Sequence, residues 1–189
     1  QEDVPRFVGH IRSEAQRLVT LIGDIIRLSQ LDEGEPMPTE TVDLLEVTRE
    51  AAENLQTAAA ARDVTVTVEG QPAELEGVRR LLYEIVYNLC DNAIKYNVTG
   101  GRVDLSVSCT GGTAAVMVRD TGIGIPADQQ DRVFERFYRV DKSHSKASGG
   151  TGLGLSIVKH AVQYHHGVIE LKSELGKGTE IRVTFPVKA

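Results

Sequence analysis

The apolar positions of the first thirty residues repeat with a seven-residue step. One row consists of Val4, Ile11, Leu18 and Ile25, and a second row, interrupted by Glu14, consists of Phe7, Leu21 and Leu28. Two such rows predict a bundle or coiled-coil helix over residues 4–31. A helix with one apolar side is not stable alone in water, so we expect it to pack against a partner helix, with dimerisation as the natural arrangement.

A glycine followed by two prolines, within residues 34–38, ends this pattern. Glycine is common just past the end of a helix, and proline cannot continue one. We therefore expect a helical region over residues 1–34, a linker over residues 35–38 and a separate domain over residues 39–189.

The hydrophobic period alternates between helix and strand after the linker. Helices are expected at residues 44–62, 78–96 and 151–165, and strands at residues 39–42, 64–69, 103–109, 114–120, 168–173 and 179–186. Glycines at residues 111–112 and 176–178 predict two hairpins. Together these patterns predict an α+β fold, a two-layer α/β sandwich with a mixed sheet and helices on one face.

Composition narrows the class of protein. The 189 residues, 41% apolar and 25% charged, suit one well-buried domain plus a smaller element. A net charge of -6 without a basic stripe argues against a nucleic-acid partner. The sequence contains no apolar run of about 18 residues, the length that a membrane span needs. Cys90 and Cys109 lie in apolar segments, as expected of thiols in a reducing cytoplasm.

The helix expected at residues 78–96 carries polar residues along one face. Asn88 and Asn92 lie one turn apart on that face, where two amide oxygens suit an octahedral Mg²⁺ that also binds water and phosphates. Lys95 adds a positive charge nearby. The alternative is a solvated face with an ion pair between Asp91 and Lys95. The full polar face is Glu84, Asn88, Asp91, Asn92, Lys95 and Tyr96, opposite an apolar stripe of Leu82, Ile85, Val86, Leu89 and Ala93.

Asp120 ends an expected strand and enters a turn that contains Gly122 and Gly124. Glycines let a backbone approach a flat ligand closely. A carboxylate there suits an exocyclic amine, which would select adenine over guanine. The alternative is an ordinary turn after a strand.

A second glycine cluster, Gly-Gly-Thr-Gly-Leu-Gly-Leu, covers residues 149–155. Its backbone N–H groups stand at an expected helix N-terminus, which is an anion site by geometry and dipole. The pattern is neither a P-loop nor a dinucleotide fingerprint, and the alternative is a flexible hinge. Residues 139–150 precede it with a composition that suits a lid over phosphates, while the aromatic residues Phe134, Phe137 and Tyr138 are expected to anchor this loop.

Five blocks therefore follow one another in a set order. They are the asparagine helix, the turn after Asp120, the aromatic and arginine block at residues 134–139, the glycine cluster at residues 149–155, and Gly-Lys-Gly-Thr at residues 176–179. This order resembles the ATP-binding catalytic domain of sensor histidine kinases over nearly the whole chain. It looks closest to the phosphate-regulon type.

The resemblance implies a Bergerat-type fold with ATP and Mg²⁺ as cofactors. It implies that Asn88 and Asn92 hold Mg²⁺, that Lys95 and Tyr96 contact the phosphates and the nucleoside, and that Asp120 binds the adenine amine. Arg139 and Lys142 would face the transferring phosphate. The other binding residues implied are Gly122, Gly124, Gly150, Thr151, Gly152, Leu153, Gly154 and Thr179.

The implied activity is transfer of the γ-phosphate of Mg·ATP to a histidine and onward to an aspartate of a response regulator receiver domain. Family members carry the acceptor histidine, followed by an acidic residue, on the first of two dimerisation helices. His10 is followed by Ile-Arg-Ser instead. Residues 1–34 therefore resemble only the second helix of that hairpin, and the phospho-acceptor helix of the parent kinase is an expected partner.

The same resemblance implies a cytoplasmic domain whose parent protein lies in the cell membrane, with the homodimer formed through the N-terminal helix. Two other hypotheses stay open. One is an ATP-hydrolysing relative of the gyrase or chaperone kind, which has a water-activating glutamate where Asn88 stands; Glu84 lies one turn earlier. The other is a module that docks a response regulator without turnover.

Overall fold

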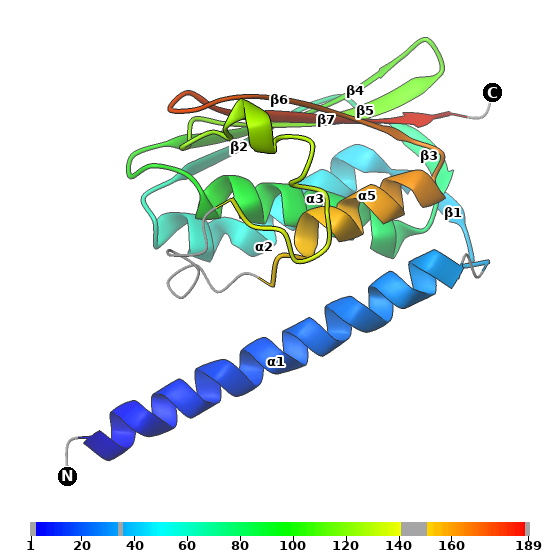
Figure 1. Ribbon diagram of the computed structural model, residues 1–189. Helices are drawn as coiled ribbons and strands as arrows, with labels where there is room; N and C mark the ends of the chain where they lie inside the picture. Colours follow the sequence, from blue (N-terminus) through cyan, green and yellow to red (C-terminus); the bar gives the residue numbers. More distant parts are fainter. Residues whose placement is uncertain (1–2, 34–35, 141–150, 188–189) are drawn as a thin grey trace.

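A computed structural model describes residues 3–33, 36–140 and 151–187, without the side chains of a few residues early in the first helix, His10 among them. The chain forms two layers, with a five-stranded sheet above three helices and a long N-terminal helix beneath them (Figure 1). Among the described residues, no helix has the length and apolar character that a membrane crossing requires.

The expected helices and strands are all present. The helices are α1 (Asp3–Glu33), α2 (Leu44–Ala60), α3 (Arg79–Lys95) and α5 (Gly154–Tyr164), with a 3₁₀ helix η1 (Ala127–Gln129). The strands are β1 (Glu40–Asp43), β2 (Thr65–Gly70), β3 (Glu74–Gly77), β4 (Arg102–Thr110), β5 (Thr113–Asp120), β6 (Val168–Glu174) and β7 (Gly178–Pro186).

The main sheet has the strand order β2-β4-β5-β7-β6. Strands β2 and β4 are parallel and the other neighbours are antiparallel, so the sheet is mixed, as predicted. Helices α2, α3 and α5 cover one face (Figure 1). Because α3 packs between α2 and α5, its polar side lies at the crevice beside α5.

Three local predictions were wrong or incomplete. Strand β3, which pairs with β1, was not expected, because four residues with two glutamates give little periodic signal. Helix α5 begins at Gly154 rather than at residue 151. Glu84 was expected on a solvated face, but only 8% of its surface is exposed because α1 covers it.

The two apolar rows of α1 have different environments. The C-terminal part of the second row meets the domain, where Leu28 is buried against Leu153 and Ile157, with Leu21 beside them, whereas Phe7 of the same row is 67% exposed. The first row stays exposed, with 55% of Ile11, 57% of Leu18 and 45% of Ile25 accessible. The exposed row leaves room for the expected partner helix, and dimerisation stays a prediction.

Candidate functional site

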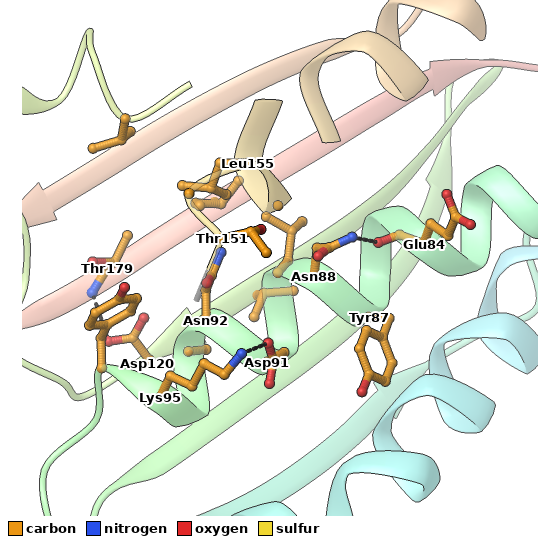
Figure 2. A pocket seen from close by; sticks show the side chains of 18 of the residues that line it. Glu84, Tyr87, Asn88, Asp91, Asn92, Lys95, Asp120, Thr151, Leu155 and Thr179 are labelled. Carbon is orange, nitrogen blue, oxygen red and sulfur yellow. Dashed lines mark hydrogen bonds and ion pairs between the residues drawn. The ribbon is translucent and has the colours of Figure 1, made fainter. Parts of the chain in front are cut away.

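A cavity of about 1280 Å³ lies between α3, the ends of β5 and β7, the segment before α5, and α1. Figure 2 shows its labelled side chains in a row, from Asp120 and Thr179 at one end, past Asn92 and Thr151, to Asn88 and Glu84 at the other. The volume exceeds that of a typical small-molecule pocket, roughly 300–1,000 Å³. A ligand longer than a single ring system therefore fits it.

Asp120 marks the first end of the cavity. Its Oδ1 accepts hydrogen bonds from the backbone N–H groups of Gly122 at 2.8 Å and Thr179 at 3.2 Å. These bonds fix the carboxylate between the turn and β7, and they leave its second oxygen as the one that can meet a ligand. Burial raises the pKa of Asp120 above its ordinary value, and the two N–H groups partly offset that rise.

Two glycines bring the turn after β5 close to the β6–β7 hairpin. A Cβ on Gly124, whose φ is 68°, would lie 2.1 Å from the carbonyl oxygen of Glu174. A Cβ on Gly178, whose φ is 102°, would lie 2.0 Å from the carbonyl oxygen of Asp120. Both positions therefore require glycine for conformation and for space.

Ser173 and Gln130 support the same turn, and neither was singled out in the sequence. The Ser173 hydroxyl accepts from the Ile125 N–H at 2.8 Å and donates to the Gly178 carbonyl at 2.9 Å. The Gln130 amide donates to the carbonyls of Ile125 and Ser173 at 3.0 and 2.9 Å. Isolated polar residues of this kind carry no motif, so only the fold identifies them.

Asn88 and Asn92 share one face of α3, as the sequence predicted, and the structure places that face at the cavity beside α5. The Asn88 Nδ2 donates to the Glu84 carbonyl at 2.8 Å, which fixes the orientation of the side-chain amide and leaves Oδ1 as the acceptor at the cavity. A Cβ on Gly154 would lie 2.9 Å from that Oδ1. The missing side chain of Gly154 therefore keeps the acceptor accessible.

Lys95 and Tyr96 line the cavity near Asp120. Lys95 forms the ion pair with Asp91 that was the alternative interpretation of this helix face. Tyr96 follows the last residue of α3, is 43% exposed, and accepts the Ile123 N–H on its carbonyl. A Cβ on Gly122 would lie 2.3 Å from this carbonyl, so the turn packs directly on the end of α3.

The residues just before α5 divide between the cavity and the core. Thr151, Gly152 and Gly154 line the cavity. Leu153 is fully buried against Leu28, so its side chain serves packing, and only its backbone can reach a ligand. Gly152 has a φ of 75° and accepts the Phe137 N–H on its carbonyl.

The aromatic and arginine block, residues 134–139, comes after η1 and forms turns and irregular backbone. Tyr138 donates to Gln129 at 3.0 Å and lies beneath the Arg132 guanidinium, 4.3 Å from ring centroid to Cζ. These contacts anchor Tyr138, as expected, whereas Phe137 is 59% exposed, so the expectation that it anchors the loop was wrong. Arg139 lines the cavity, whereas the predicted residues Lys142 and Gly150 lie outside the described part of the chain.

Helix α1 also lines the cavity, which the sequence did not indicate. Its contributions are Thr20, Asp24 and Arg27. The other cavity residues that sequence reasoning did not assign include Asn54, Arg62, Tyr83, Tyr87 and Arg80. They come from α2, the turn after it and α3, whose packing places them at one surface, and they share no sequence motif.

The arrangement suits a purine nucleotide. One end offers a fixed carboxylate oxygen for an exocyclic amine, and the middle offers amide oxygens and the N-terminus of α5, where phosphates bind well. No group of three or more His, Cys, Asp or Glu with metal-ligand geometry occurs among the described residues. The asparagine oxygens of α3 are hard ligands that line this part of the cavity, and water or phosphate oxygens can complete such a set.

Comparisons with known proteins agree with this chemistry. Residues 77–189 match the family model described as histidine kinase-, DNA gyrase B-, and HSP90-like ATPase. The chain is 40% identical over 187 residues to the sensor-like histidine kinase SenX3 of Mycolicibacterium smegmatis, covering 98% of this chain and 49% of the relative. It is 33% identical to the sensor histidine kinase WalK of Bacillus subtilis, covering 97% of this chain and 31% of the relative. The chain thus spans about half the length, or less, of these relatives.

Solved structures show the same architecture. The mycobacterial sensor histidine kinase MprB is 32% identical, with a TM-score of 0.69, and covers 79% of this chain and 97% of that chain. Full-length ShkA, solved in complex with AMPPNP, is 26% identical, with a TM-score of 0.83 over 98% of this chain and 39% of that one.

Proposed function

The chain belongs to the histidine kinase-, DNA gyrase B-, and HSP90-like ATPases and is the ATP-binding catalytic region of a sensor histidine kinase; from this premise we propose that it holds Mg·ATP for transfer of the γ-phosphate to a histidine. The observation that carries the proposal is the Asp120 carboxylate, fixed by two backbone N–H groups at one end of a long cavity. Asparagines and a helix N-terminus lie further along the same cavity.

The adenine base lies at the Asp120 end in this proposal. The second carboxylate oxygen accepts a hydrogen bond from the exocyclic amine, and Gly122 and Gly124 let the flat ring approach the backbone. Thr179 supports the base by holding Asp120, to which its N–H donates at 3.2 Å. Tyr96 contacts the nucleoside from the end of α3.

Asn88 and Asn92 are the proposed Mg²⁺ ligands. The residues present fit the ion, because the bond from Asn88 to the Glu84 carbonyl turns the amide oxygen toward the cavity, and hard oxygen ligands are what Mg²⁺ prefers. When bound, the ion neutralises phosphate charge. The asparagines would hold it by side-chain oxygens, with phosphates and water completing the set.

The phosphates extend toward α5 in this proposal. Backbone N–H groups of Thr151, Gly152 and Gly154, at the N-terminus of α5, would meet anionic oxygens, whereas the Leu153 N–H donates to the Thr151 hydroxyl oxygen at 3.3 Å and would have to leave it to do so. Lys95 and Arg139 add positive charge. Phosphoryl transfer needs positioning and charge neutralisation more than covalent chemistry from the protein. The roles of Lys142 and Gly150 stay predictions from the sequence.

The activity of the whole protein is also a proposal, because the chain spans about half of its relatives or less. We propose that the phosphate passes from a histidine on the acceptor helix of the parent kinase to a response regulator receiver domain. Residues 1–34, 35–38 and 39–189 act as dimerisation helix, linker and catalytic domain. The homodimer, the membrane location of the parent and the phosphate-regulon type remain predictions.

Calorimetric titration with ATP, with and without Mg²⁺, tests this proposal when Asp120→Asn is compared with the wild type. The amide can still accept the two N–H bonds, but it presents a donor where the adenine amine needs an acceptor. We expect a loss of about 1.5–3 kcal/mol, roughly 10- to 150-fold in affinity. The affinity of this variant for inosine triphosphate should rise relative to its affinity for ATP, because the carbonyl oxygen of the hypoxanthine ring can accept a hydrogen bond from the side-chain amide that replaces the Asp120 carboxylate.

Asp104→Asn is the matched control. Asp104 lies on β4 in the same sheet, where it pairs with Arg102 and Thr67 away from the cavity. We expect this variant to bind ATP like the wild type. If the folded wild type binds no ATP, or if both variants lose affinity equally, the adenine site proposed at Asp120 is wrong, and the docking module without turnover becomes the better hypothesis.

A further inference from the structure

One carboxylate of α1 reaches into the nucleotide cavity. Asp24 lines the cavity, and its Oδ2 accepts a hydrogen bond from the Thr151 hydroxyl at 2.9 Å. Thr151 stands three residues before α5, and its Oγ1 also accepts the Leu153 N–H at 3.3 Å. Docked α1 therefore places the negative charge of Asp24 beside the N-terminus of α5, where the phosphates are proposed to bind.

A second carboxylate lies on the same wall. Glu84 is one turn from Asn88, and its Oε1 lies 3.4 Å from Arg27 of α1 and 3.2 Å from Arg80. Its Oε2 is buried and has no hydrogen-bond partner among the described residues. A buried carboxylate oxygen without a partner is unfavourable. Docking of α1 thus carries a local cost that release of the helix would remove.

The remaining contacts of α1 lie outside the cavity. Leu28 packs on Leu153 and Ile157, and Asp32 pairs with Arg136 and with His160. These contacts hold α1 against α5 without involving the cavity. The docked position therefore combines an apolar and ionic attachment outside the cavity with three α1 side chains that line it. Of these, Thr20 is uncharged, Arg27 lies 3.4 Å from Glu84, and Asp24 alone is negative.

We propose that Asp24 makes docking of α1 and binding of the nucleotide phosphates antagonistic. The inference rests on the proposed function and adds a regulation of the same site. Phosphates at the N-terminus of α5 repel the Asp24 carboxylate and compete with it for the Thr151 hydroxyl. Such coupling is reciprocal. Docking of α1 lowers the affinity for the triphosphate by some factor, and bound triphosphate lowers the equilibrium constant for docking of α1 by the same factor.

The number of phosphates distinguishes this charge effect from a structural one. Asp120 and Thr179, at the proposed adenine end, are separated from Thr151 by Asn92 in the cavity (Figure 2). Removing the charge of Asp24 should therefore change the affinity for ATP most, for ADP less and for adenosine not at all. A general loosening of the fold would change all three affinities alike.

The test is calorimetric titration of Asp24→Asn with Mg·ATP, Mg·ADP and adenosine. Asparagine keeps an acceptor for Thr151, so the fold should persist. We expect the ATP affinity to rise about fivefold or more, the lower range of typical coupling between sites. Glu33→Gln is the control, because it makes the same charge change on α1 at a residue that pairs with Ser29 and does not line the cavity.

A second measurement follows the helix itself. Hydrogen exchange of the wild-type amides in residues 21–33 should increase when the Mg²⁺ complex of a non-hydrolysable ATP analogue binds, and adenosine should not increase it. Unchanged exchange together with an unchanged ATP affinity of Asp24→Asn would overturn the proposal. A weaker ATP affinity of that variant would also overturn it and would make Asp24 a ligand of the metal or its water. Adenosine binding without ATP binding in the wild type would instead contradict the phosphate site of the proposed function.

Discussion

His165 offers a test of how the pocket helix is anchored. It follows the last residue of α5, and its buried ring accepts the Val78 N–H on Nε2 at 3.0 Å. Its Nδ1 lies 2.8 Å from the Ala161 carbonyl. Because the Val78 N–H must donate, the ring is neutral with its proton on Nδ1. Val78 has no side-chain cap of its own and precedes α3, so His165 secures the start of the helix that carries Asn88 and Asn92.

The cost of replacing His165 with glutamine follows from these contacts. Glutamine can still accept from Val78, but it cannot also donate to Ala161, so one hydrogen bond worth about 0.5–1.5 kcal/mol is lost. The ring also packs edge-on against Tyr164 and Phe185, with centroids 5.5 and 5.9 Å away. Such ring pairs contribute about 0.5–1.5 kcal/mol each beyond the buried area. We therefore expect His165→Gln to lower the free energy of unfolding by about 2–3 kcal/mol at pH 7.5.

The pH dependence has a definite sign. Burial lowers the pKa of His165 below the ordinary value of 6.5, with the Ala161 carbonyl opposing the shift. The unfolded chain then binds the proton more readily than the folded one. The stability that neutral His165 contributes is present above pH 6.5 and is lost as the pH falls toward the folded pKa, with a limiting slope of about 1.4 kcal/mol per pH unit.

Urea unfolding at pH 7.5, 6.5 and 5.5 measures this contribution. Glutamine does not titrate, so the stability difference between the wild type and His165→Gln should shrink as the pH falls. His166→Asn is the control, because His166 is exposed and its φ of 55° suits asparagine; the His166 charge is a minor cause of the lowered pKa of His165, and burial, the largest cause, remains in this variant. A stability difference between wild type and His165→Gln that stays constant over this pH range would refute the assignment of a buried neutral imidazole at His165.

Two further substitutions test the cavity. Gly178→Ala places a Cβ 2.0 Å from the Asp120 carbonyl oxygen at a φ of 102°, so we expect the free energy of unfolding in urea to fall by about 2–5 kcal/mol. The control Gly111→Ala, at a φ of 60° in open space, should lower it by about 1 kcal/mol. Equal losses would contradict the close approach of Gly178 to Asp120. Lys95→Met removes a partly exposed ion pair with Asp91, so stability should change by less than about 0.5 kcal/mol. Its ATP affinity, measured by calorimetry, should fall about tenfold if one phosphate contact is lost, whereas an unchanged affinity would show that Lys95 stays with Asp91.

Local periodicity was sufficient for most of the elements. The seven-residue repeat of α1, the stripe of α3 and the alternation of β4 and β5 each extend over enough residues to show which side is apolar. Strand β3 is four residues long and gave no such signal. Helix α5 begins three residues late because Thr151 is bonded to α1 and Gly152 adopts a φ of 75°.

The chemical character of the pocket was also present in the sequence. Asn88, Asn92 and Asp120 belong to continuous motifs, in which residue type and spacing carry the chemistry. Their detailed partners were not predictable. Whether Lys95 meets Asp91 or a phosphate depends on side-chain geometry, and the sequence supports both.

Only the tertiary structure determined what covers the pocket. Asp24 and Arg27 are ordinary polar residues with no motif, and they reach the cavity because α1 packs beside it, while Ser173 of β6 supports the turn next to the cavity. Glu84 belongs to a polar helix face by its period, yet α1 buries it. Periodicity reports the environment averaged along one element, whereas burial and hydrogen-bond partners depend on elements that lie far away in the sequence.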